Sequence, residues 1–179
     1  FIPGILPIPA HALASTKYID ALSDLILNSR LPVGLVTLGI QTLPDSKLGE
    51  SCKEGLLRLR RLGVLIHLLQ FSGSAEQLHW IEELQMEGVH VDMTLFRETE
   101  LPTHLLSELQ KSRTQIYASN LTLVKDLENA TLLQADHCYG GLMMPPLSRH
   151  QMLQINDSRI AKAIFSLHPH PQPNQNGDK

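Results

Sequence analysis

The sequence has no long hydrophobic run, few cysteines and aromatic residues, and little net charge. No stretch approaches the roughly 20 apolar residues that a membrane-spanning helix needs, so we expect no insertion into a membrane. The formal net charge of -3 over 179 residues leaves no basic field of the kind that nucleic-acid binding requires. The 42% of hydrophobic residues nevertheless predicts a globular chain with a buried core.

Two cysteines, Cys52 and Cys138, would form a disulfide only if the fold brought them together. We expect both to be reduced thiols, which indicates an intracellular protein of the cytoplasm or nucleus. Three Asn-x-Ser/Thr sequons, at Asn120, Asn129 and Asn156, point mildly the other way, toward glycosylation. Asn120 has a simpler role as the N-cap of a helix.

The common catalytic and cofactor motifs are also missing. The phosphate-binding patterns GxGxxG and GxxxxGK[ST], the zinc pattern HExxH and a hydrolase nucleophile elbow do not occur. Nine histidines are present, but no pair has a convincing metal-ligand spacing. We therefore predict no metal, no cofactor and no catalytic residue, and an enzyme is the less favoured interpretation.

Several chemically active side chains have simpler structural interpretations. His67 and His90 fall in or near apolar strands, where packing in the core or at an edge explains them. His137 and Cys138 are neighbours in a predicted strand, so their side chains point to opposite faces and are badly placed to share a proton. The run Arg97–Glu100 follows a strand end and is interpreted as a solvated loop.

Short apolar runs alternate with amphipathic stretches along most of the chain. The predicted strands are Val33–Ile40, Val64–Phe71, Val89–Phe96 and Thr114–Ala118, with a last one within Leu132–Tyr139. Gly63 and Gly88 are predicted to end the helices that precede the second and third of these strands. This alternation is typical of an α/β fold with a mainly parallel sheet. Right-handed crossovers are then expected to put helices on both faces, as in a Rossmann-like three-layer sandwich. A fragment of a (β/α)₈ barrel is an alternative, although about 250 residues are typical of that fold.

Composition divides the chain into four parts. The prolines of Phe1–Ala14 predict an irregular N-terminal segment, and residues 15–145 are expected to form the α/β domain. A helical segment is expected over residues 146–167, after two consecutive prolines. Residues 168–179 are rich in Pro, Asn and Gln and are predicted to be a disordered tail.

A candidate ligand site follows from the strand ends, because parallel α/β sheets bind ligands at the carboxyl ends of their strands. The segment Ser72-Gly73-Ser74 joins a strand to the start of a helix, where free N–H groups attract an anion. A tight turn with a serine cap explains the same segment without a ligand. The full candidate set at this edge is Gln41, Thr42, Ser72, Gly73, Ser74, Ser119 and Asn120.

The order of segments resembles the von Willebrand factor A-type domain. The segments that follow the family's order are Val33–Gly39, Val64–Gly73, Gly88–Phe96, Leu105–Leu109 and Ile116–Leu127. The resemblance implies an interaction module on an α/β scaffold. The family's Asp-x-Ser-x-Ser metal motif does not occur in the N-terminal segment, and Phe71-Ser72-Gly73 stands where the family has Thr-Asp-Gly. A degenerate or missing metal site is therefore implied.

Two functions compete. The first is a non-catalytic protein-interaction or scaffold domain of a larger protein or complex, which binds a protein partner. The lack of catalytic motifs favours it. The alternative is an enzyme or sensor that binds a small anionic ligand, a phosphate or nucleotide, at the carboxyl ends of the strands.

Overall fold

The computed structural model of this chain describes residues 4–41, 49–97 and 103–143, and it alternates strands with helices throughout. With η for a 3-10 helix, the elements are β1 (Gly4–Ile8), η1 (Ala10–Ala14), α1 (Thr16–Asn28), η2 (Val33–Leu35), β2 (Val36–Ile40), α2 (Gly49–Arg61), β3 (Leu65–Phe71), α3 (Ala75–Glu83), β4 (Gly88–Asp92), η3 (Met93–Phe96), α4 (Thr103–Ser112), β5 (Gln115–Ser119), α5 (Val124–Leu132) and β6 (His137–Cys138). The predicted α/β class is confirmed. The helix predicted over 146–167 and the tail over 168–179 lie outside the described residues.

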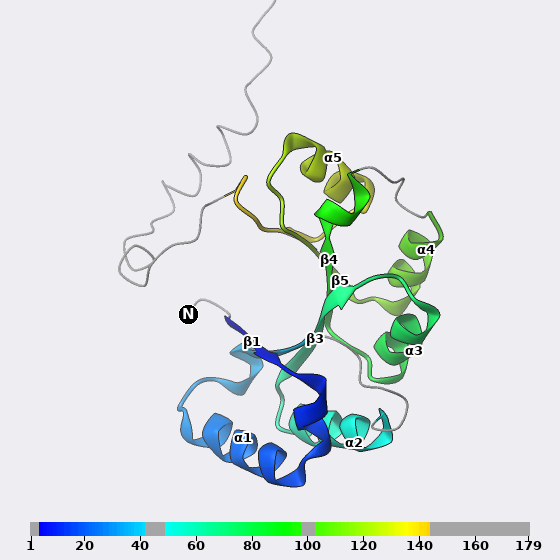
Figure 1. Cartoon of the computed structure of the whole chain (residues 1–179). Coiled ribbons are helices and arrows are strands. Elements are labelled where there is room, and N and C mark those ends of the chain that lie inside the picture. The colour runs from blue at the N-terminus through cyan, green and yellow to red at the C-terminus, as the bar shows by residue number, and fades with distance from the viewer. Residues whose placement is uncertain (1–3, 42–48, 98–102, 144–179) are drawn as a thin grey trace, which may run out of the picture.

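All six strands are parallel, and their order in the sheet, β1-β2-β3-β4-β5-β6, is their order in the chain. When strand order never reverses, right-handed crossovers return over the same face each time. Figure 1 shows the result, with α1 to α5 around the outside of a curved sheet. The parallel sheet was predicted correctly. Helices on both faces, as in a Rossmann-like sandwich, would need a reversal of strand order that the described sheet does not have.

The face of the sheet toward the helices is apolar and buried. Its side chains alternate along the strands and are Ile8, Leu38, Ile40, Ile66, Leu68, Val89, Val91, Ile116 and Ala118, none more than 4% exposed. Burying each Ile or Leu contributes about 1.5–3 kcal/mol. Apolar side chains of the helices cover this face, for example Ile19 in α1 and Leu59 in α2. Within the described residues, we find no helix whose length and apolar character would let it cross a membrane.

Some local boundaries differ from the prediction. The segment Phe1–Ala14, expected to be irregular, contains β1 and η1. Pro7 is tolerated because β1 is an edge strand of the described sheet, where it pairs with β2 alone. The strand predicted to start at Val33 starts at Val36, after η2. The strand predicted to end at Phe96 ends at Asp92, where the chain turns into η3.

Three residues were predicted to mark helix ends, and the prediction is confirmed for Ser74 and Gly63 but wrong for Gly88. The hydroxyl of Ser74 caps α3 by accepting the N–H of Gln77 at 3.2 Å, as predicted. Gly63, with φ of 93°, has the left-handed conformation that often ends a helix. Gly88, predicted to end α3 in the same way, lies in β4 instead, and the left-handed residue after α3 is Gln85, with φ of 47°.

Both cysteines are free thiols, as predicted. Cys52 is buried in α2, where its thiol donates to the carbonyl of Ala10 at 3.2 Å. Cys138 is half-buried in β6 and packs against the core. Burial raises the pKa of both thiols, which keeps them protonated at neutral pH.

Candidate functional site

The face of the sheet away from the helices carries a row of imidazole and phenol rings. We call this the aromatic row, and it consists of His67, His90, Tyr117, His137 and Tyr139 from β3, β4, β5, β6 and the residue after β6. The strand register aligns His90 with Tyr117, and Tyr117 with His137. Because side chains alternate along a strand, these rings lie opposite the buried aliphatic side chains of the same strands.

A hydrogen-bond chain runs through the buried part of the row. His67 and His90 are only 3% and 1% exposed. Nδ1 of His67 lies 3.0 Å from Nε2 of His90, and Nδ1 of His90 lies 2.8 Å from the hydroxyl oxygen of Tyr139. Burial, reinforced by the other histidines, lowers the pKa of each of these two histidines to about 4, so both rings are neutral at pH 7. A neutral imidazole has one N–H, so the three residues donate in one direction along the whole chain.

The rings also stack across the strands. Tyr117 lies between His90 and His137, with ring centroids 4.6 Å and 4.5 Å away and interplanar angles of 16° and 22°. Tyr139 meets His90 edge-on, at 5.7 Å and 67°. Exposure increases along the row, from the buried histidines through the half-buried Tyr117 to the exposed His137, and Tyr139 is 44% exposed. The row therefore offers ring surface at its β6 end.

The buried end of the row depends on a missing side chain. Gly88 pairs with His67 in the register of β3 and β4. A Cβ atom at Gly88 would lie 2.7 Å from Cε1 of His67 and 2.8 Å from both ring nitrogens. The glycine predicted to end a helix thus makes room for the His67 ring.

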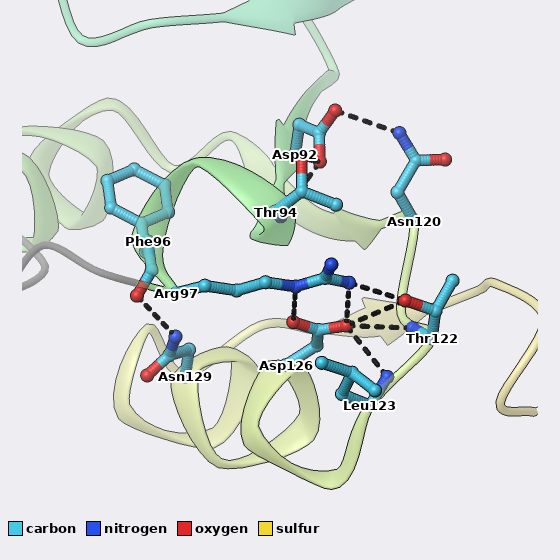
Figure 2. Close-up of polar contacts among 9 residues, drawn as sticks. All are labelled: Asp92, Thr94, Phe96, Arg97, Asn120, Thr122, Leu123, Asp126 and Asn129. Atoms are coloured by element: carbon cyan, nitrogen blue, oxygen red, sulfur yellow. Dashed lines mark hydrogen bonds and ion pairs between the residues drawn. The ribbon is translucent and has the colours of Figure 1, made fainter.

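Polar groups from three neighbouring strands meet at the carboxyl edge of the sheet. The register aligns Asp92 with Ser119, and Tyr139 directly follows β6. The carboxylate of Asp92 accepts hydrogen bonds from Nδ2 of Asn120 at 2.8 Å and from the N–H and hydroxyl of Thr94 at 2.9 Å and 2.6 Å (Figure 2). We call Asp92, Thr94, Ser119, Asn120 and Tyr139 the carboxyl-edge site.

This site combines one carboxylate with neutral polar groups. Burial raises the pKa of Asp92, but hydrogen bonds from Thr94 and Asn120 outweigh it and lower the pKa overall, so the carboxylate is charged at neutral pH. Burial raises the pKa of Tyr139, and a hydrogen bond with Ser119 opposes that change. The site therefore presents a negative acceptor beside amide and hydroxyl groups, a set suited to the N–H and O–H donors of a small ligand.

An ion pair beside the carboxyl-edge site joins the segment that follows β4 to the segment that follows β5. Arg97, which the sequence suggested lies in a solvated loop, donates from Nε and Nη2 to the two carboxylate oxygens of Asp126 at 2.7 Å and 2.6 Å (Figure 2). Nη2 also donates to the hydroxyl of Thr122. Asp126 is fully buried and accepts the N–H groups of Thr122 and Leu123 at 2.8 Å and 2.9 Å. These contacts tie the segment after η3 to the start of α5 and so position the chain that follows Asn120.

The structure places two of the three predicted sequons. Nδ2 of Asn120 is bonded to Asp92, and the side chain lies at the exposed edge. Asn129 is 5% exposed, and its Nδ2 donates to the carbonyl of Phe96 at 2.9 Å (Figure 2), so the folded chain does not present it for glycosylation. Asn156 lies outside the described residues.

Of the site residues predicted from the sequence, Ser119 and Asn120 come together at the carboxyl edge. Ser119 is buried, and its hydroxyl donates to the carbonyl of Val91 at 3.1 Å. Asn120 does not cap a helix, because α5 starts at Val124 and Asn120 has φ of 59°. Its amide instead links the end of β5 to Asp92 at the end of β4.

The predicted turn Ser72-Gly73-Ser74 satisfies its own polar groups. The N–H and hydroxyl of Ser72 donate to Oε1 of Gln77 at 2.7 Å and 3.0 Å, and Gly73 has φ of 83°. In the described part of the chain, no hydrogen bond joins this turn to the carboxyl-edge site. Gln41 is exposed after β2, and Thr42 lies outside the described residues.

Sequence reasoning missed Asp92, Tyr117 and Tyr139. A signal for Asp92 and Tyr117 was present. His90 and Asp92 alternate with valines in β4, and Gln115, Tyr117 and Ser119 alternate with Ile116 and Ala118 in β5. Alternation of this kind indicates a strand with one polar face rather than two buried faces. The apolar residues between these positions led instead to the interpretation of each run as a strand buried on both faces.

In the described residues, consecutive parallel strands with the helices on the outside define a (β/α)-barrel-like fold, and comparison with known proteins agrees. Its fold is similar to an EAL domain protein of Listeria monocytogenes (TM-score 0.68, 16% identity, 84% of this chain and 62% of that one). It is also similar to the PaMucR phosphodiesterase solved as a c-di-GMP complex (0.71, 16%, 83% and 63%). A third similar structure is Bacillus subtilis YkuI, which has an EAL domain and was solved with substrate c-di-GMP and calcium (0.65, 14%, 91% and 42%).

These similarities concern the fold. The chain spans 62%, 63% and 42% of the lengths of these three structures. No protein-family model matches the sequence, and no curated protein matches it. The EAL-like fold is TIM-barrel-like, which agrees with the consecutive strand order.

Two sequence-based interpretations are corrected by this comparison. The resemblance to the von Willebrand factor A-type domain was wrong, because the similar structures are EAL domains. It rested on alternating apolar strands and helices, which doubly wound sheets and barrels share. The interpretation as a non-catalytic scaffold domain was also wrong, because the comparison finds EAL-domain structures, a phosphodiesterase among them, rather than interaction modules.

Proposed function

We propose that this chain binds a nucleotide of the cyclic-dinucleotide class at the carboxyl-edge site. The observation that carries the proposal is the hydrogen bond of 2.8 Å between Asn120 and Asp92, which joins the ends of two neighbouring strands. Barrels and parallel α/β sheets bind their ligands at this edge. The ligand class is suggested by PaMucR and YkuI, which have similar folds and were solved with c-di-GMP.

The polar groups of the site suit the donors and acceptors of such a ligand. The charged Asp92 accepts hydrogen bonds from base N–H or ribose hydroxyl groups, and Asn120 both donates and accepts. The phosphate is proposed to lie toward the start of α3, after Ser72-Gly73-Ser74, because a helix N-terminus attracts anions. Gln41, which is exposed directly after β2, is proposed to belong to the same edge.

A resident metal ion does not fit the described residues. YkuI was solved with calcium. Within residues 4–41, 49–97 and 103–143, no group of three or more His, Cys, Asp or Glu side chains is arranged to hold a metal ion. We therefore derive no metal-dependent step and propose binding, with hydrolysis as a separate arm of the test.

The proposal is tested by isothermal titration calorimetry of the whole chain with c-di-GMP, with and without Ca²⁺. Asn120→Gly removes the amide and keeps a residue that tolerates positive φ. We expect it to weaken binding by about 2- to 12-fold, the net value of one hydrogen bond. Gln85→Gly is the matched control, because it removes an exposed amide side chain from another left-handed position, at the end of α3.

The outcomes separate the alternatives. Tight binding that Asn120→Gly weakens and Gln85→Gly leaves unchanged supports the carboxyl-edge site. If the wild-type chain binds no c-di-GMP under either condition, the proposal fails. Conversion of c-di-GMP to a linear product, followed by chromatography, would add catalysis to the proposed binding.

A further inference from the structure

The rings of His90, Tyr117 and His137 form one continuous stack across β4, β5 and β6. Their centroids are 4.6 Å and 4.5 Å apart. These separations are close to the spacing of about 4.7–4.9 Å between neighbouring strands. Each strand therefore adds one ring to the stack, and the next ring position lies one strand spacing beyond His137.

The two ends of the stack differ. His67 lies beside the inner end, 5.0 Å from the Tyr117 ring and 5.3 Å from the His90 ring, and is tilted against both rings. At the outer end, His137 is exposed, and β6 is the last strand of the described sheet. Among the described residues, Tyr117 is the one ring that stacks on His137. Within the part of the chain that the structure describes, the other face of the His137 ring is therefore open to a further ring.

We infer that the outer face of His137 receives the planar base of a bound nucleotide as the fourth ring of this stack. The inference rests on the proposed function, because the base would belong to the same ligand whose polar groups meet Asp92. The His137 row lies two residues below Tyr139, about 6.6 Å along the strand. The base would therefore enter the concave side of the sheet, while the sugar and phosphate stay at the carboxyl edge.

A nucleobase fits this position better than an aliphatic group. Every ring of the stack combines a flat π face with a polar edge, as imidazole and phenol do. A nucleobase has the same combination, and stacking of a base on an aromatic side chain contributes substantially to binding whichever base it is. The position therefore selects for a planar heteroaromatic ring and discriminates little between bases.

The test compares His137→Leu with His137→Phe in the whole chain. Both variants remove the imidazole nitrogens, but only phenylalanine keeps a ring to stack on. His79→Leu is the control, because His79 is an exposed histidine of α3, a helix on the outer side of the sheet. Calorimetry measures the binding of c-di-GMP, GMP and ribose 5-phosphate, the last of which lacks a base.

We expect His137→Leu to weaken the binding of c-di-GMP and GMP by roughly tenfold. His137→Phe and His79→Leu should change these two affinities by less than about twofold. Binding of ribose 5-phosphate should not change in any variant. As a second readout, the Cε1 proton of His137 should move upfield when GMP is added, because a stacked base shields it.

Each other result contradicts the inference in a recognisable way. If the wild type binds c-di-GMP and the Leu and Phe variants bind it equally well, the stacking position is wrong and the proposed function stands. If His137→Leu weakens ribose 5-phosphate as much as GMP, His137 has a structural role only, and stacking is again excluded. If the wild type binds no nucleotide, the proposed function fails and this inference fails with it.

Discussion

Arg97 donates two parallel hydrogen bonds to the carboxylate of Asp126, of 2.7 Å from Nε and 2.6 Å from Nη2. Such a bidentate pair fixes orientation as well as charge. Asp126 is 0% exposed, so its charge depends on this partner and on the two backbone N–H groups that it also accepts. Removing a buried, multiply bonded charge is much more costly than removing a charge at the surface.

Asp126→Asn should lower the free energy of unfolding by about 2 kcal/mol, since the charge-assisted bonds to Arg97 and to the start of α5 are lost. Asp20→Asn is the matched control, because Asp20 pairs with Arg58 at 2.5 Å on the surface. We expect that substitution to change stability by less than about 0.5 kcal/mol. Urea unfolding followed by circular dichroism measures both, and equal effects would show that the buried pair has no special weight.

The histidine chain should make stability depend on pH below neutrality. The folded pKa of His67 and of His90 is about 4, below the ordinary 6.5, so the unfolded chain binds these protons first. Stability should therefore fall as the pH drops from about 6.5 to about 4, by up to about 1.4 kcal/mol per pH unit for each histidine. His90→Phe should make this decline shallower, because it removes one of the two buried imidazoles. An unchanged slope in His90→Phe would contradict the assignment.

Gly88→Ala should destabilise the fold by about 1–3 kcal/mol, because the new methyl group meets the buried ring of His67. A Cβ atom at this position lies 2.7 Å from that ring, whereas one at Gly34 has nothing within 4 Å. Gly34→Ala is therefore the control. In the double variant Gly88→Ala/His67→Ala the clash disappears, so the two substitutions should be strongly non-additive in thermal unfolding. If the two stability changes simply add, the contact with His67 does not cause the destabilisation by Gly88→Ala.

Ser74→Asp should test the proposed phosphate position without unfolding α3. Aspartate caps a helix as well as serine does, so stability should stay within about 0.5 kcal/mol of the wild type. Its negative charge at the start of α3 should weaken c-di-GMP binding by repelling the phosphate. Ser15→Asp is the matched control, because Ser15 caps α1 in the same way. Equal c-di-GMP affinity in the wild type and Ser74→Asp would remove this turn from the proposed site.

The parts of the fold that local patterns determine were predictable. The apolar runs located β2 to β5 within a few residues, and Ser74 and Gly63 marked helix ends correctly. The arrangement of the strands was not, because a doubly wound sheet and a barrel use the same strand–helix unit and differ only in which strands become neighbours. β1 was missed because proline density argues against a strand, and the exemption for an edge strand depends on the sheet order.

The sequence predicted the edge of the sheet at which the candidate site lies, but not all of the residues that form it. The rule that ligands bind at carboxyl ends led to Ser119 and Asn120, which do lie at that edge. Asp92 was hidden because the run Val89–Phe96 was treated as one strand, although the Asp92 carboxylate ends it by capping η3. The aromatic row depends on the register between β4, β5 and β6, which no single strand sequence contains.

The position of Pro7 in β1 has a consequence for how the chain behaves toward its own copies. The edge strands of the described sheet are β1 and β6. An exposed edge strand is a template for pairing with a strand of another chain. Pro7 removes one N–H donor from β1, and β6 has only 2 residues. Both edges of the described sheet are therefore poor templates, which opposes strand-by-strand aggregation at β1 and β6.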